Sequence, residues 1–93
     1  MISASEQRRL RAVGERIRFA RESKGWTQEM ASAETGLSVS SLSAWENGQY
    51  EPSSRCYLVL QEKLSRPISW FRAEELWEGG NGSSGADPGS LDS

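Results

Sequence analysis

The 93-residue sequence contains no histidine, a single cysteine (Cys56) and no aspartate before Asp87. Without histidine, neither a Ser–His–Asp nor a Cys–His arrangement for nucleophilic catalysis can be built. One cysteine is too few for a structural zinc site or an internal disulfide. A phosphate-cradling glycine loop is missing too. These absences predict a protein that is not an enzyme and that needs no metal and no cofactor.

Long apolar runs are also missing. No segment approaches the ~20 apolar residues of a membrane span. No apolar core follows the charges at the N-terminus, as it would in a signal peptide. An unpaired thiol without an export signal suggests the cytoplasm. The sequence is therefore expected to belong to a cytoplasmic protein without a membrane partner.

Charge is distributed unevenly, although the net charge is only −2. All 11 Lys and Arg residues lie within residues 1–72, beside eight glutamates. Residues 73–93 hold five acidic residues and no basic one. The front of the chain, and not its end, is therefore suited to a polyanionic partner.

Cap and stop signals divide the chain into five short helices, without strand-like alternation. Ser3 and Glu6 form a capping-box pattern ahead of a helix over about residues 4–23, and Thr27 is the next N-cap. Ser38 caps a helix that reaches about residue 46, a fourth helix opens at residues 52–53, and a fifth runs from Pro67 to about residue 77. The sequence predicts an all-α domain over 1–78. A Gly- and Ser-rich acidic tail, expected to be disordered, follows over 79–93.

Residues 27–46 contain the most informative pattern, two short helices joined by a bend with Gly36. This is the helix-turn-helix arrangement. The stretches "GERIRFARESKGWTQEMA", "TGLSVSSLSAWENG", "EPS" and "LSRPISWF" follow one another between Val13 and Phe71, about two-thirds of the chain. Together they resemble the Cro-like phage-repressor (XRE-type) family of DNA-binding domains. The resemblance implies a five-helix, lambda-repressor-like fold.

The family resemblance also implies roles for the matched positions. Gln28 falls where a family glutamine usually holds a DNA phosphate. Arg21 and Glu46 fall where an ion pair ties the first helix to the third, and the segment after Pro67 falls where family dimers meet. Double-stranded DNA and a second copy of the chain are the implied partners. The implied DNA-binding residues are Gln28, Ser38, Val39, Ser40, Ser43, Ala44, Asn47, Gln49 and Arg55.

Helical spacing by itself divides the residues of the third helix. At ~100° per residue, Leu42 and Trp45 point together, and the opposite side holds only small or uncharged residues. Ser38 is then a cap, and Ser41 packs beside the second helix. No outer residue can make a bidentate contact with guanine or adenine, so phosphates and DNA shape must supply more of the specificity. A protein-binding surface and a plain solvated face remain open alternatives.

The fifth helix carries two apolar stripes. Ile68 and Phe71 share one side, and Trp70, Ala73 and Trp77 lie on another at i, i+3 and i+7. We interpret the second stripe as a two-fold dimer contact. The alternative is that it packs back onto the first helix.

Several polar residues have simpler explanations as well. Arg21 and Glu46 could be unpaired surface charges, or Arg21 could contact DNA directly. Gln28 could be an exposed residue without a role. The arginines within residues 8–11 could be solvated, or they could bind a phosphate or the minor groove.

The sequence as a whole predicts a homodimeric, sequence-specific DNA-binding transcription regulator. In the simplest case it is a repressor that occludes a palindromic operator. A phage repressor, a host regulator and the antitoxin of a toxin–antitoxin pair all fit, so a toxin or another regulator is a further candidate partner. The alternative is an adaptor that uses the same fold to hold a protein.

Overall fold

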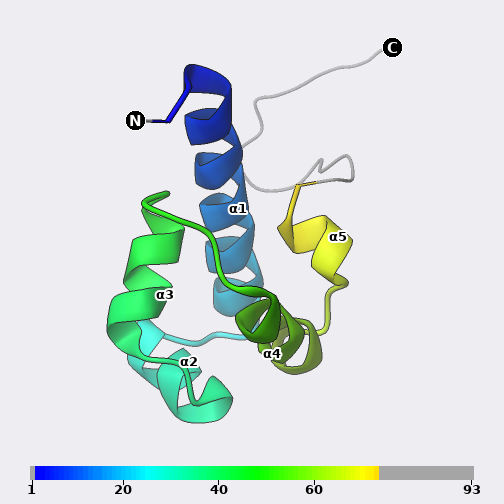
Figure 1. The fold of residues 1–93 in the computed structure, drawn as a ribbon. Helices are drawn as coiled ribbons and strands as arrows, with labels where there is room; N and C mark the ends of the chain where they lie inside the picture. The colour runs from blue at the N-terminus through cyan, green and yellow to red at the C-terminus, as the bar shows by residue number, and fades with distance from the viewer. Residues whose placement is uncertain (1, 74–93) are drawn as a thin grey trace.

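A computed structural model describes residues 2–73 of the chain. This part consists of α1 (Ala4–Ser23), α2 (Gln28–Thr35), α3 (Val39–Glu46), α4 (Ser54–Leu64) and α5 (Ile68–Phe71), and its residues form no strand. The long α1 runs through the middle, with α3 on one side, α5 on the other, and α2 and α4 near its C-terminal end (Figure 1). The expected all-α, five-helix fold is confirmed. Within residues 2–73, no helix has the length and apolar character needed to span a membrane.

Side-chain caps begin four of the five helices. Ser3, Thr27, Ser38 and Ser53 each accept a hydrogen bond from the backbone N–H three residues later, at 3.1, 3.1, 3.1 and 3.3 Å. Each cap satisfies one of the N–H groups that the start of a helix leaves without a partner. Gly36 ends α2 with a φ of 77°, a left-handed conformation that glycine adopts at little cost. The predicted starts of α1, α2 and α3 are confirmed.

The core lies between α1 and the shorter helices. Its largest fully buried side chains are Val13, Ile17, Leu42, Leu60 and Phe71, contributed by α1, α3, α4 and α5. Burial of these side chains removes apolar surface from water and holds segments together that are distant in sequence. Trp26 is partly buried against this core, and Trp45, Tyr57, Leu60 and Leu64 are buried within it.

The backbones of α1 and α3 approach each other closely at Gly14. A Cβ atom at this position would overlap the carbonyl oxygen of Trp45 and would lie 2.8 Å from the carbonyl oxygen of Glu46. Backbone oxygens cannot move aside as a flexible side chain can. The missing side chain of Gly14 therefore lets the last turn of α3 rest directly on the backbone of α1.

The last helix is shorter than the sequence indicates. α5 ends at Phe71, and Ala73 has a φ of 64°, outside the helical region. The Ala73 N–H donates to the carbonyl of Trp70, a bond that tightens the turn as the helix ends. The expectation of one helix continuing to about residue 77 is therefore wrong. Trp77 and the expected domain boundary between residues 78 and 79 lie outside the described part of the chain.

Trp70 belongs to the core of the monomer. Its side chain packs against α1, with ring centroids 6.3 Å from Phe19, and the residue is only 5% exposed. Arg16 donates a 2.6 Å hydrogen bond to the Trp70 carbonyl, and the guanidinium of Arg66 lies 4.4 Å from the centroid of the indole. The interpretation of Trp70 as part of an exposed dimer stripe is wrong. The alternative, packing against the first helix, is what this residue does.

Candidate nucleic-acid interface

α2 and α3 form a helix-turn-helix unit whose second helix has one buried side. Leu42 and Trp45 anchor α3 in the core with 1% and 3% of their surfaces exposed, as helical spacing predicts. Ser38 caps the first turn of α3 and also donates from its hydroxyl to that of Ser41 at 3.0 Å. Ser38 and Ser41 therefore serve the helix itself, although Ser38 remains exposed.

The predicted DNA-binding residues differ in exposure. The exposed ones are Ser38, Ser40, Asn47, Gln49 and Arg55. The half-buried ones are Gln28, Val39 and Ser43. We call these eight residues the candidate DNA surface.

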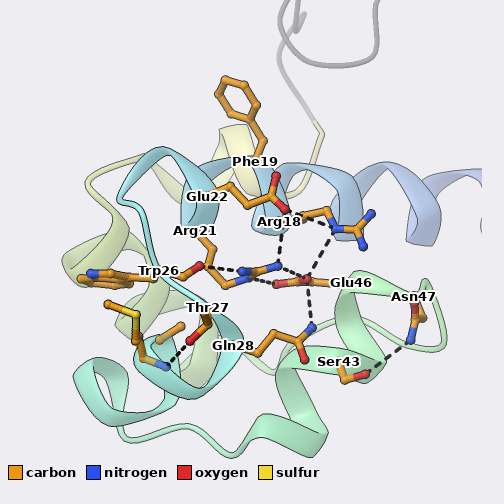
Figure 2. Close-up of polar contacts among 12 residues, drawn as sticks. Arg18, Phe19, Arg21, Glu22, Trp26, Thr27, Gln28, Ser43, Glu46 and Asn47 are labelled. Atoms are coloured by element: carbon orange, nitrogen blue, oxygen red, sulfur yellow. Dashed lines mark hydrogen bonds and ion pairs between the residues drawn. The ribbon is translucent and has the colours of Figure 1, made fainter.

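Ala44 does not face outward as expected. It is 8% exposed, and its carbonyl accepts a 3.0 Å hydrogen bond from the N–H of Gln49. The chain after α3 thus turns back towards this position. Ala44 is therefore a packing residue of the C-terminal half of α3, which leaves the N-terminal half and Asn47 as the accessible side. Asn47 in turn approaches Ser43, with its Nδ2 3.4 Å from the serine hydroxyl (Figure 2).

A single carboxylate connects the ends of three helices (Figure 2). Glu46, at the end of α3, accepts from Nε of Arg21 at 2.7 Å and from Nη2 of Arg21 at 2.9 Å. The Nε2 of Gln28, the first residue of α2, donates to Oε1 of Glu46 at 3.1 Å. Only 2% of the Glu46 side chain and 9% of the Arg21 side chain are exposed. We call these three residues the Glu46 network.

The guanidinium of Arg21 donates its hydrogen bonds to groups within the protein. Besides the bidentate pair with Glu46, its Nη1 donates to the carbonyl of Trp26 at 2.7 Å. The hydrogen bonds from Glu46 raise the pKa of Arg21 above its ordinary value, although burial acts in the opposite direction. The ion pair that the family resemblance implies is thus present. Its geometry gives Arg21 a structural role, joining α1 to the segment before α2 and to the end of α3.

Gln28 is half-buried, and its side-chain amide uses part of its hydrogen-bonding capacity within the protein. One N–H of its amide is directed at Glu46, and a side-chain amide carries two. Gln28 also opens α2, where the positive end of the helix dipole favours an anion. The arrangement holds this amide at a defined place on the candidate DNA surface while leaving a second N–H for an external oxygen.

A second polar network lies between α1 and the segment after α3. Arg9 pairs with Glu51 and with Glu6, and the hydroxyl of Tyr57 donates to Oε2 of Glu51 at 2.8 Å. Burial disfavours the Glu51 carboxylate, but the hydrogen bonds from Arg9 and Tyr57 outweigh it and lower the pKa of Glu51. Arg9 thus has a partner within the fold. No spacing signal in the sequence relates Arg9 to a glutamate so distant along the chain.

The fold and the exposed side of α3 define a helix-turn-helix domain. A family model described as helix-turn-helix matches residues 17–71, which is more than half of the chain and includes α2 and α3 completely. The chain belongs to this family of DNA-binding transcription regulators, the Cro-like, XRE-type helix-turn-helix proteins. Neither the curated proteins nor the solved structures contain a significant match.

Proposed function

We propose that this protein is a sequence-specific repressor that places the N-terminal half of α3 in the major groove of an operator. The observation that carries the proposal is the small, uncharged outer side of α3 beside the fixed amide of Gln28. Small side chains allow the backbone of α3 to approach the base edges closely. Gln28 would bind a backbone phosphate and set the register of the helix on the duplex.

Direct readout by α3 is expected to be weak. The exposed hydroxyl of Ser40 can donate or accept, and the half-buried Val39 can contact a thymine methyl group. Neither residue makes the bidentate contact that discriminates strongly between bases. Ser40→Ala is therefore expected to cost at most ~1 kcal/mol of binding free energy. Gln28→Ala is expected to weaken binding to all sequences alike, because a phosphate contact carries no base information.

Weak readout by one helix favours recognition by two copies of the chain. A homodimer on a two-fold-related operator would add the contacts of two α3 helices, with half-sites ~34 Å apart. Trp70 is only 5% exposed within one chain and so offers a partner little surface, and Ala73 is half-buried. Repression by occlusion is proposed because it requires only that the bound dimer cover the DNA.

The proposal is tested by selecting bound duplexes from a random pool and measuring affinity over a salt series. We expect a palindromic consensus, a steep loss of affinity with added salt, and a complex containing two protein chains per duplex. Absence of binding, or binding that ignores salt, would contradict DNA recognition and would favour the protein adaptor. A non-palindromic consensus bound by one chain would contradict the dimer alone.

A further inference from the structure

Arg18 is an exposed guanidinium at the edge of the Glu46 network. It lies on α1, one turn before Arg21, and 61% of its side chain is exposed. Its Nε is 3.9 Å from Oε1 of Glu46 and 3.9 Å from Oε2 of Glu22. Both distances exceed a hydrogen bond, so the two carboxylates attract the guanidinium without occupying its donors.

The carboxylate of Glu46 determines how Arg18 is oriented. Oε1 of Glu46 already accepts hydrogen bonds from Arg21 and Gln28, at 2.9 and 3.1 Å. Because this carboxylate is held by Arg21 and is almost entirely buried, it is a fixed negative charge that draws the Nε of Arg18 inward. The two terminal nitrogens of Arg18 then point away from Glu46 (Figure 2).

Arg18 and Gln28 approach the same oxygen of Glu46 from different helices. Arg18 comes from α1 and Gln28 from α2, on opposite sides of the carboxylate in Figure 2. Each has donors beyond the one directed at Glu46. Gln28 is neutral and Arg21 is buried, so Arg18 contributes the exposed positive charge in this group of residues.

The remaining partner of Arg18 is easily replaced. Glu22 is 62% exposed, and an ion pair between two exposed side chains adds little to stability. With Arg18 and Arg21 facing Glu22 and Glu46, the cluster has no net charge. A phosphate that takes the place of Glu22 would offer Arg18 the bidentate, charge-assisted contact that a guanidinium makes best.

We propose that Arg18 binds a DNA backbone phosphate next to the one held by Gln28, and that it leaves Glu22 when it does so. The assignment rests on the proposed function, since it requires the candidate DNA surface to lie on a duplex. Arg18 then supplies a salt-dependent contact that the neutral Gln28 cannot supply.

The test is the equilibrium binding of the full chain to a mixed-sequence duplex over a salt series. Arg18→Gln is expected to weaken binding and to reduce the magnitude of the slope of log K against log salt by about 0.9, the value for one lost phosphate contact. Arg18→Lys keeps the charge, so the slope is retained while the bidentate geometry is lost. Lys63→Gln removes the same charge from the last turn of α4 and is expected to leave the slope nearly unchanged.

Glu22→Gln provides a second readout. It is expected to strengthen binding more in the wild-type background than in the Arg18→Gln background, because only the former has a guanidinium to release. Equal effects in both backgrounds would contradict the exchange of partners.

The outcomes for Arg18 and for the proposed function are separable. Wild-type protein that does not bind duplex, or binds it independently of salt, would overturn the proposed function. Salt-dependent binding by the wild type, with the same slope in Arg18→Gln, would overturn the assignment of Arg18 alone. The thermal midpoint of Arg18→Gln is expected to match that of the wild type, and an unchanged midpoint attributes the slope difference to the interface.

Discussion

Removal of the Glu46 carboxylate is expected to destabilise the domain severely. In Glu46→Ala, the buried guanidinium of Arg21 loses both of its carboxylate contacts, at 2.7 and 2.9 Å, and the Gln28 amide loses its acceptor. Breaking a buried pair by deleting one partner typically costs about 3–5 kcal/mol, because an uncompensated charge is left inside the protein. That loss is comparable to the whole stability of many small domains.

The matched control is Glu22→Ala. Glu22 also contacts Arg21, with Oε2 3.8 Å from Nη2, but 62% of its side chain is exposed. Since exposed ion pairs contribute about 0–1 kcal/mol, we expect a small loss in this variant. Each variant thus removes a carboxylate that contacts Arg21, and the two carboxylates differ in how deeply they are buried.

Urea unfolding followed by circular dichroism measures both losses. Glu46→Ala is expected to lower the unfolding midpoint strongly with little change in m, or to leave the chain unfolded without denaturant. Combining it with Arg21→Met is expected to recover part of the loss, because the double variant buries no unpaired charge. Equal losses in Glu46→Ala and Glu22→Ala, or no recovery in the double variant, would contradict a cost that comes from the buried, unpaired charge of Arg21.

Three further outcomes are expected. Gly14→Ala should lower the free energy of unfolding by about 1–3 kcal/mol, because the new Cβ overlaps the α3 backbone. At Gly25 a Cβ meets nothing within 4 Å, so Gly25→Ala should lose only the free energy of placing alanine at a positive φ. A smaller loss at Gly14 than at Gly25 in thermal unfolding would contradict the close approach. Because the pKa of Glu51 is lowered, its contribution to the free energy of unfolding is present above the unfolded-state pKa and disappears as the pH falls through the folded-state value. Glu51→Gln should therefore flatten the plot of unfolding free energy against pH in that acid range, and an unchanged plot would contradict the pairing. Trp70→Ala should cost about 3–5 kcal/mol at any protein concentration, since the side chain is buried within one chain; a loss that depends on concentration would indicate a dimer contact instead.

Local signals explain how much of the fold was predictable. The caps at Ser3, Thr27 and Ser38 act on N–H groups three residues away, so the sequence nearby contains all that is needed to place the helix starts. The end of α5 has no such signal, because alanine at position 73 is a good helix former and nothing in its side chain favours the positive φ that it adopts. The interpretation of Trp70 as part of a dimer stripe depended on that end, since the expected stripe required a longer helix.

The candidate site was predictable to a similar degree. Helical spacing placed Leu42 and Trp45 inside and Ser40 outside, but it could not show that the segment after α3 turns back over Ala44. The pairing of Arg21 with Glu46 came from the family resemblance and not from spacing. That Gln28 shares the same carboxylate became visible only in three dimensions, since distance along the chain carries no information about such contacts.

The convergence of three helix ends on Glu46 has a consequence for the thermodynamics of binding. Residues from α1, α2 and α3 meet at the two oxygens of one carboxylate, which fixes the amide of Gln28 relative to the end of α3. A surface that is already ordered loses little conformational entropy on association, and it does not reshape itself to suit a different duplex. Any deformation that a close fit requires must then come from the DNA. Operators that bend or narrow easily are therefore expected to be favoured even at base pairs that no side chain touches.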